Sequence, residues 1–177
     1  MSELRPPLST VSHGHSAAPL RVDVAEMKCA AGPGTSLRTH ALGSCIGLTV
    51  WDPEARVGGL LHYMLAKPHD KEEAREFPYM YAVSGIPALF RAVSELGAKR
   101  ERLIACAAGA SEFLGEDSSL SIGKRNRAIL SKLFIHNCIV LHAEDTGGNQ
   151  ARQMQLDVGT GIVTLRVQNE ERVLWRP

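Results

Sequence analysis

The sequence predicts a single α+β domain in which strands outnumber helices. Short segments rich in apolar and β-favouring residues recur between turn residues, and only two segments place their apolar residues at helical spacing. Several strand segments are joined by short turns, so the sheet is at least partly antiparallel. The length of 177 residues, of which 44% are hydrophobic, fits one domain with a sizeable core.

Composition and charge exclude several functional classes. Twenty Lys and Arg residues balance nineteen Asp and Glu residues, giving a formal net charge of +1, so general nucleic-acid binding is not expected. No apolar run reaches the roughly 18 residues of a membrane span, and the N-terminus lacks the apolar core of a secretory signal. We therefore expect a cytoplasmic protein that is not embedded in a membrane.

The chain divides into a tail and a globular domain. Residues 1–20 are rich in Pro, Ser and His without periodicity, which predicts a disordered N-terminal tail. Residues 21–177 form the predicted domain. Its four cysteines are expected to be reduced thiols, because a chain of this size and apolar content needs no disulfide framework.

The first half of the domain predicts a hairpin. Strands are expected over residues 37–42, 45–51 and 57–65, with residues 52–55 (Asp-Pro-Glu-Ala) as the turn between the last two. Residues 67–78 are charged and bounded by prolines, which predicts an exposed loop or a short helix.

The second half predicts two helices and four further strands. Apolar residues recur at helical spacing over 84–96, and Gly97 ends that helix. Pro87 fits this helix only within its first turn. The other expected elements are a helix over 124–134 and strands over 102–107, 138–143, 152–158 and 162–167.

A cysteine and a histidine in the predicted hairpin are the first candidates for chemistry. With residues 52–55 as a loop closed by Trp51 opposite Arg56, Cys45 lies directly opposite His62. Side chains opposed in this way have Cβ atoms about 5 Å apart, so the sulfur and the imidazole can meet. A thiolate is a nucleophile, and a neighbouring imidazole takes its proton or stabilises its charge.

Residues around this pair could support catalysis. Gly43 and Ser44 precede the cysteine and can direct backbone N–H groups at a developing oxyanion. A third polar group usually orients the base, and Thr39 is a candidate. The alternatives for this role are Asp52, Asp145 and Asn126.

Other interpretations of the reactive side chains stay open. A cysteine and a histidine on apolar strands commonly serve only as core residues. His136, Cys138 and His142 alternate along an expected strand, but no fourth zinc ligand accompanies them, so no metal site is expected.

One basic run has two interpretations. Lys124, Arg125 and Arg127 lie near a helix start. They are interpreted as a solvated helix face, and the functional alternative is docking to an acidic partner surface.

Four segments together form a recognisable pattern. They are Thr39-His40-Ala41-Leu42-Gly43-Ser44-Cys45, Gly58-Gly59-Leu60-Leu61-His62-Tyr63-Met64-Leu65, Ile122-Gly123-Lys124-Arg125-Asn126 and Asp145-Thr146-Gly147-Gly148. In order and spacing, across residues 22–167, the chain resembles the chemoreceptor glutamine deamidases, the CheD family.

The resemblance implies a fold, a reaction and a set of partners. The implied fold is a mixed, largely antiparallel β-sandwich flanked by helices. The implied reaction is hydrolysis of glutamine side chains on methyl-accepting chemotaxis receptors to glutamate, by a Cys-His-Thr triad and a thioester intermediate. The triad falls on Cys45, His62 and Thr39. No cofactor or metal is implied, and a CheC-type phosphatase is an implied partner besides the receptors.

The chain departs from the family pattern at three places. The family tends to have a Lys-x-Phe-Gly-Gly-Ala-like segment where residues 106–110 read Cys-Ala-Ala-Gly-Ala, and an Asp where this chain has Val83. A Gly that is common before the late Arg of the family is Ala151 here, before Arg152. These positions bear on substrate docking and partner binding more than on the triad. The alternative functions are a non-catalytic binding module that regulates a CheC-type phosphatase, and transfer of the thioester's acyl group to an amine.

Overall fold

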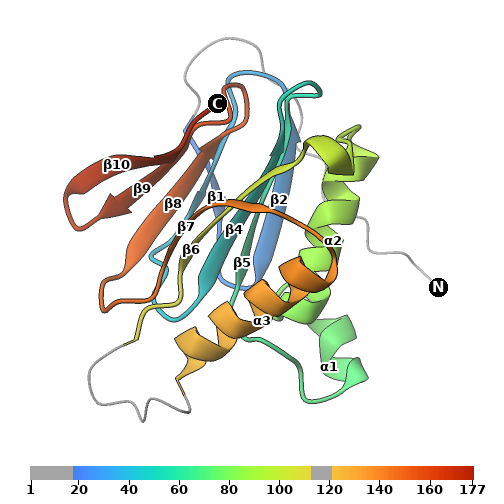
Figure 1. The fold of residues 1–177 in the computed structure, drawn as a ribbon, viewed down its shortest axis with the longest axis vertical. Helices are drawn as coiled ribbons and strands as arrows, with labels where there is room; N and C mark the ends of the chain where they lie inside the picture. Colours follow the sequence, from blue (N-terminus) through green and yellow to red (C-terminus); the bar gives the residue numbers. More distant parts are fainter. Residues whose placement is uncertain (1–17, 113–120) are drawn as a thin grey trace.

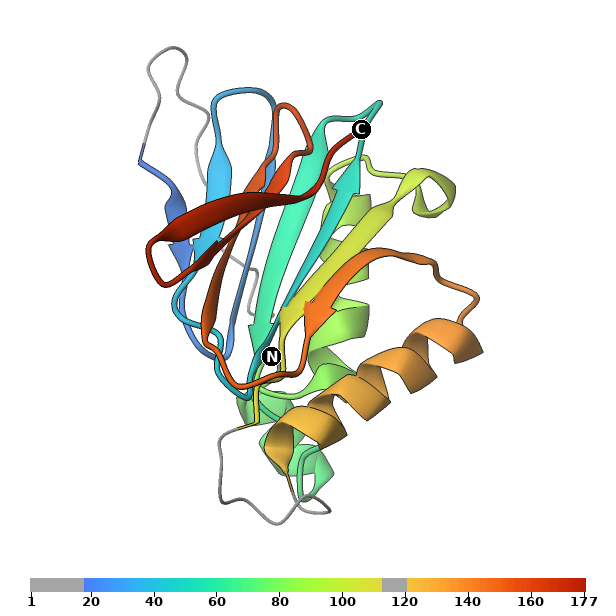
Figure 2. The ribbon, with the colours of Figure 1, turned by 60° about the vertical axis from the view of Figure 1, so that its left-hand side comes forward.

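Two five-stranded sheets pack face to face, and helices cover the outer face of the second sheet (Figures 1 and 2). The computed structural model describes residues 18–112 and 121–177. The first sheet has the strand order β1 (Leu20–Val22), β3 (Ser36–Thr39), β8 (Arg152–Asp157), β9 (Val163–Val167), β10 (Glu170–Trp175). The second has the order β2 (Glu26–Ala31), β5 (Val57–Tyr63), β4 (Ile46–Asp52), β6 (Ile104–Gly109), β7 (Leu141–Thr146).

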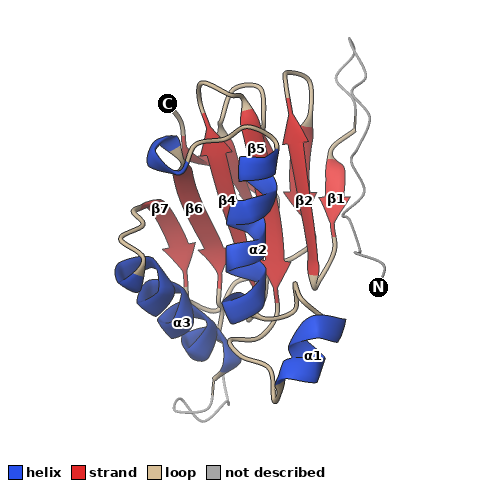
Figure 3. Cartoon of the chain, turned by 90° about the vertical axis from the view of Figure 1, so that its right-hand side faces the viewer, coloured by secondary structure: helices blue, strands red, loops and turns tan. Residues whose placement is uncertain are grey.

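The helices lie together on one side of the second sheet (Figure 3). They are α1 (Lys71–Glu76), α2 (Ala82–Glu95) and α3 (Ile122–His136), with a 3-10 turn over Arg100–Arg102. None of the helices described is long and apolar enough to cross a bilayer.

Both sheets are mixed. β1 pairs with β3, and β6 with β7, in parallel, whereas the other strand pairs are antiparallel. The expected α+β architecture, a largely antiparallel sandwich flanked by helices, is confirmed.

The central hairpin is buried on both faces. Ile46, Leu48 and Val50 of β4 belong to the core under the helices, whereas Trp51 belongs to the core between the sheets. Every residue of β4 and of β5 is buried. A strand covered on both faces has no solvated side, which explains its continuous apolar sequence.

The register of this hairpin differs from the expected one. Asp52 pairs with Val57, so the loop comprises residues 53–56 and begins one residue later than predicted. The carboxylate of Asp52 accepts hydrogen bonds from two amides within the loop, and Arg56 adopts a left-handed conformation (φ 51°) before the return strand. As a result Gly47, and not Cys45, lies opposite His62.

Two further expectations need correction. Pro87 lies beyond the first turn, because α2 begins at Ala82; the helix tolerates it since the ring is on the exposed side and only the bond to the Val83 carbonyl is lost. Cys138 is not in a strand, because it adopts a left-handed turn (φ 53°) between α3 and β7.

The edges of the sheets contain the strands that the sequence did not reveal. β1, β2 and β10 were not expected, and all three are edge strands with partly solvated residues. Of the expected tail, residues 1–20, positions 1–17 lie outside the described residues. Its last residue, Leu20, is the first residue of β1.

Asp52 secures the loop of the central hairpin. Its buried carboxylate accepts bonds from the Arg102 guanidinium at 2.7 and 3.0 Å and from the Lys99 amide at 2.8 Å. These donors outweigh the opposing effect of burial and lower the pKa of Asp52 from 3.8 to about 2. The same carboxylate that sets the register therefore also joins the hairpin to the segment before β6.

Replacing Asp52 by Asn should destabilise the fold in a pH-dependent way. Because the pKa of Asp52 is lower in the folded chain, its contribution is present above about pH 4 and is lost as the pH falls toward 2. The pKa difference corresponds to about 2 kcal/mol. In urea titrations, the free energy of unfolding of Asp52→Asn should be lower than that of the parent by this amount at pH 7 and by less at pH 3. A gap independent of pH would contradict the assignment.

Asp157→Asn is the matched control. Asp157 also accepts a hydrogen bond from an amide within a hairpin turn, that of Thr160 at 2.9 Å, but no guanidinium of the described residues binds it. We expect this substitution to lower the free energy of unfolding at pH 7 by less than about 1 kcal/mol.

Candidate active site

Cys45 lies in a tight segment immediately before β4. Its side chain is half-buried at the edge of the core between the sheets. The Cys45 carbonyl accepts a bond from the Ala110 amide at 2.8 Å, and the Gly43 carbonyl accepts one from the Ser111 amide at 2.8 Å. Gly109 permits this approach, because a Cβ there would lie 2.2 Å from the Cys45 oxygen. The segment is therefore held against the end of β6.

The amides of this segment have a different environment from its carbonyls. The Gly43, Ser44 and Cys45 carbonyls all accept hydrogen bonds. Among the described residues, no other residue accepts a hydrogen bond from the N–H groups of Gly43, Ser44 or Cys45, and the Cys45 amide lies near its own sulfur. Unengaged backbone donors beside a thiol are the elements of an oxyanion-binding site.

His62 lies in the layer between the two sheets. It is opposite Gly47, where a Cβ would contact Leu42, Met154 and Thr39 from the first-sheet side. Directly paired residues project to the same face, so His62 points into this layer. The ring is fully buried, and neither nitrogen has a hydrogen-bond partner among the residues described.

Thr39 comes from β3 and reaches the same layer. Its hydroxyl accepts a bond from the Met154 amide at 3.0 Å and lies 3.4 Å from the Met154 carbonyl. Its methyl group lies 3.3 Å from the ideal Cβ position of Gly47. The structure thus brings Thr39 and His62 into one layer, but the Thr39 hydroxyl is engaged with backbone and not with the imidazole.

Cys45 and His62 are diagonal neighbours and not a directly opposed pair. The residue paired with His62 is Gly47, two positions after Cys45. Alternate residues of a strand share a face, and diagonal neighbours are about 7–8 Å apart. The expected direct pairing of Cys45 with His62 is wrong. The observed register differs from the expected one by two residues, so both side chains still lie on the same face of the sheet. No hydrogen bond joins the sulfur to the ring.

Burial acts on both titratable groups. It raises the pKa of the Cys45 thiol above 9.0, with the residue's own amide opposing the change. It lowers the pKa of His62 below 6.5, with the nearby Val22 carbonyl opposing. The raised pKa of the thiol and the lowered pKa of the imidazole both favour the neutral forms at pH 7. A neutral imidazole can accept a proton.

Asn126 connects α3 to the segments on both sides of the hairpin. Its Nδ2 donates to the Ser44 carbonyl at 2.9 Å and to the Met64 carbonyl at 2.8 Å. Ser44 precedes Cys45, and Met64 follows β5, which contains His62. One buried carboxamide therefore fixes the separation of the two chains that present the candidate nucleophile and base.

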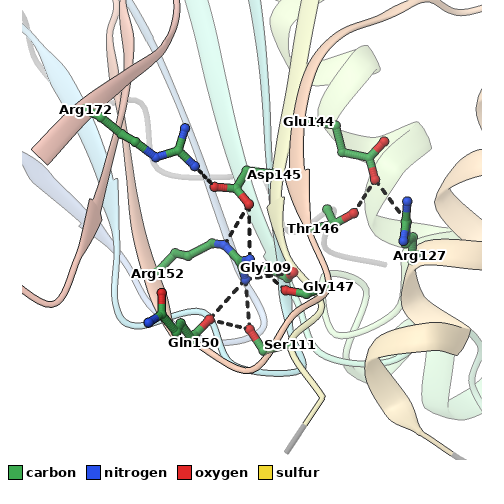
Figure 4. A network of polar contacts seen from close by, with 10 residues as sticks. All are labelled: Gly109, Ser111, Arg127, Glu144, Asp145, Thr146, Gly147, Gln150, Arg152 and Arg172. Atoms are coloured by element: carbon green, nitrogen blue, oxygen red, sulfur yellow. Dashed lines mark hydrogen bonds and ion pairs between the residues drawn. The ribbon is translucent and has the colours of Figure 1, made fainter. Parts of the chain in front are cut away.

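Arg152 supports the same segment from the first sheet (Figure 4). Its backbone pairs with Leu42 in both directions. Its guanidinium donates to the Ser111 hydroxyl at 2.9 Å and the Gly147 carbonyl at 2.6 Å, and forms an ion pair with Asp145 at 3.1 Å. The Ser111 amide donates to the Gly43 carbonyl, so the guanidinium stabilises the cysteine segment through Ser111.

The structure also shows where two of the alternative orienting residues lie. Asp52 lies at the far end of β4 from Cys45, about 20 Å away along a seven-residue strand, so it cannot orient His62. Asp145 is engaged with Arg152 and Arg172. Within the described residues, no group of three or more His, Cys, Asp or Glu side chains is placed to hold a metal ion.

Two surface grooves flank α3. The larger, about 600 Å³, lies between α2 and α3 and is lined by apolar residues such as Phe90 and Leu133. The other, about 470 Å³, lies between α3 and residues 65–67 and includes Asn126 in its wall. Cys45, His62 and Thr39 line neither groove.

Comparison with known proteins agrees with this architecture. The family model described as "CheD chemotactic sensory transduction" matches residues 64–167. The chain belongs to the CheD family. Thr39, Cys45 and His62 lie before the span that the family model matches.

Individual CheD proteins align over most of the chain. "Probable chemoreceptor glutamine deamidase CheD" of Solibacter usitatus is 42% identical over 154 residues, which cover 86% of this chain and 91% of the relative. "Probable chemoreceptor glutamine deamidase CheD 1" of Syntrophus aciditrophicus is 38% identical, over 82% of this chain and 91% of the relative. The resemblance to the CheD family is confirmed.

Sequence reasoning missed Arg152 as a supporting residue of the site. The sequence shows it as an arginine that begins an expected strand and as the late Arg of the family pattern, with no structural role attached. Its guanidinium partners come from β6, the segment after it and the turn after β7, so no local spacing links them. A single arginine in a polar segment gives no signal for such a role.

Removing the Asn126 carboxamide should destabilise this CheD protein. Asn126→Ala leaves the buried Ser44 and Met64 carbonyls without their donor, so the free energy of unfolding should fall by about 2–3 kcal/mol in urea titrations. The control is Asn137→Ala, which removes an exposed side chain that donates to the Leu133 carbonyl at 2.8 Å on the same helix. That change should lower the free energy of unfolding by less than about 1 kcal/mol. Equal losses would contradict the role assigned to Asn126.

Proposed function

We propose that this protein is a cysteine-dependent protein-glutamine deamidase that converts glutamine side chains of methyl-accepting chemotaxis receptors to glutamate. The names of its CheD relatives support the reaction and the substrate class. The observation that carries the catalytic assignment is Cys45, half-buried beside unengaged backbone donors and on the same face as a neutral, unpartnered His62.

The first step is attack of Cys45 on the carboxamide. The Sγ atom forms a bond to the carboxamide carbon as His62 takes the thiol proton. Proton transfer must accompany attack, because burial keeps the thiol protonated at neutral pH. The amides of Gly43, Ser44 and Cys45 are the proposed donors to the oxyanion that forms. The diagonal placement of Cys45 and His62 requires the pair to close up when the glutamine enters.

The second step releases ammonia and the third restores the thiol. The His62 imidazolium gives its proton to the amide nitrogen as the C–N bond breaks, leaving a thioester on Cys45. Water then attacks the thioester carbon while His62 takes a proton from it. The C–S bond breaks, the thiolate regains the proton, and glutamate leaves. Atoms balance with water as the only co-reactant, and no cofactor takes part.

Thr39 is the proposed third member of the triad. Its hydroxyl is held by the Met154 backbone within the layer that contains His62. From there it limits the positions available to the imidazole and can turn toward it when the site closes. The role proposed is to orient the base, as in other nucleophile–base pairs.

The proposal also covers the extent of the catalytic domain, its location in the cell and a regulatory partner. Residues 21–177 form the proposed catalytic domain, acting in the cytoplasm on the cytoplasmic part of the receptors. A CheC-type phosphatase is the proposed regulatory partner. The competing function, a non-catalytic module that regulates such a phosphatase, requires no reaction at Cys45.

Mass spectrometry of a receptor cytoplasmic domain incubated with the protein tests the reaction. Conversion of an amide to an acid adds about 1 Da at a glutamine, and Cys45→Ala should abolish the gain because the proposed thioester forms on the Cys45 sulfur. The matched control is Cys138→Ala, which removes an exposed cysteine and should keep the parent activity. Deamidation by Cys45→Ala would refute the nucleophile assignment. Incorporation of an added primary amine would instead indicate acyl transfer.

The pH dependence of Cys45 alkylation tests the protonation state of the free site. Because the thiol pKa is raised above 9.0, the thiolate fraction is small at pH 7 and increases about tenfold per pH unit. The rate of iodoacetamide labelling of the Cys45 peptide, followed by mass spectrometry, should therefore rise about 100-fold from pH 6.5 to 8.5. A rate that is flat over this range would show a preformed thiolate–imidazolium pair and overturn the neutral-pair mechanism.

A further inference from the structure

The groove between α3 and residues 65–67 carries a charge pattern that the catalytic assignment does not use. It has a volume of about 470 Å³. Its wall combines apolar side chains with three cations. The lining residues are Leu65, Ala66, Lys67, Ile122, Arg125, Asn126, Ala128, Ile129 and Lys132.

The cations of this groove differ from the neighbouring cations of α3. Lys67, Arg125 and Lys132 are exposed, and none forms an ion pair with a described residue. By contrast, Lys124 pairs with Glu112 and Arg127 pairs with Glu144, each at 3.2 Å. On α3, therefore, the two cations outside the groove are paired with carboxylates, whereas Arg125 and Lys132 along the groove have no ion-pair partner among the described residues.

A buried polar atom lies in the wall of the same groove. Asn126 is fully buried, and its Oδ1 has no donor among the residues described. Buried acceptors without a partner are uncommon and costly. The Oδ1 atom of this lining residue is therefore left unsatisfied by the described residues.

The groove shares residues with the support of the cysteine segment. Asn126 donates to the Ser44 carbonyl at 2.9 Å, so the groove wall is bonded to the residue before Cys45. The first turn of α3 is closely packed on the segment after β6, since a Cβ at Gly123 would lie 2.6 Å from the Ala110 oxygen. Ala110 in turn binds the Cys45 carbonyl. A chain seated in the groove is therefore next to the proposed nucleophile segment.

We propose that this groove docks an acidic, amphipathic segment of the substrate receptor that flanks the target glutamine. The inference rests on the proposed deamidase function and adds the specificity of its substrate. Apolar residues of the segment contact Ile122 and Ile129, and its carboxylates lie among Lys67, Arg125 and Lys132. Charge complementarity at an exposed rim favours encounter and orientation and is weakened by salt.

Binding to a receptor cytoplasmic domain tests docking separately from catalysis. Cys45→Ala serves as the background, so that the substrate is not consumed. In this background, the triple variant Lys67→Gln, Arg125→Gln, Lys132→Gln removes the charges of the groove. The matched control Lys124→Gln, Arg127→Gln, Arg166→Gln removes three exposed charges that are paired outside it.

We expect the groove variant to bind the receptor domain at least tenfold more weakly at 50 mM salt, with a smaller loss at 500 mM salt. The control variant should bind within about twofold of the background. In the active protein, the groove variant should raise KM for the receptor, while kcat and the iodoacetamide reactivity of Cys45 stay near the parent values.

The outcomes separate docking from deamidation. Equal binding by the groove variant and the background overturns the docking proposal, even if the parent deamidates the receptor. So does the absence of binding to any receptor domain tried, and so does an equal loss in the control variant. Binding that depends on the groove, without deamidation by the parent, supports docking and refutes the proposed reaction instead.

Discussion

The burial of the central hairpin on both faces is the constraint on which the rest of the structure depends. β4 and β5 lie between the helices and the first sheet, so their side chains alternate between two apolar layers. His62 falls in the layer between the sheets, where burial lowers its pKa. Cys45, just before β4, falls at the edge of that layer. Burial therefore keeps both the Cys45 thiol and the His62 imidazole neutral at pH 7.

Two polar side chains, on opposite sides, hold the cysteine segment at the edge of the layer between the sheets. Asn126 binds the cysteine segment and the end of β5 from the helical side, and Arg152 braces the same segment through Ser111 and Leu42 from the first sheet. Asn126 occupies the Ser44 carbonyl and the Ser111 and Ala110 amides occupy those of Gly43 and Cys45, whereas no other described residue accepts from the N–H groups of these three residues. An oxyanion site needs this asymmetry, because a carbonyl that pointed inward would repel the developing charge.

Some cations of α3 are paired with carboxylates of the same chain, and others have no ion-pair partner among the described residues. The net charge of the chain is close to zero, which excludes a broad electrostatic surface. Local pairing nevertheless leaves a small cationic groove, because the carboxylates of Glu112 and Glu144 reach Lys124 and Arg127 but not Arg125. The docking proposed for this groove is therefore local and adjacent to the cysteine segment.

The sequence by itself determined the fold class, most central elements and the candidate residues. Alternating apolar strands and two amphipathic helices are local patterns, and the motifs around Cys45, His62 and Asn126 are contiguous. The edge strands β2 and β10 lacked such a pattern, because edge strands are partly solvated.

Only the tertiary structure decided the register of the hairpin, the support of the site and the charge of the groove. The register depends on Asp52, whose carboxylate also binds Arg102, 50 residues away. Arg152 gains its role from partners on three separate segments, and Arg125 differs from Arg127 only in which carboxylates the fold brings near. These contacts join distant parts of the chain, so they depend on how the sheets and helices pack and leave no periodic trace in the sequence.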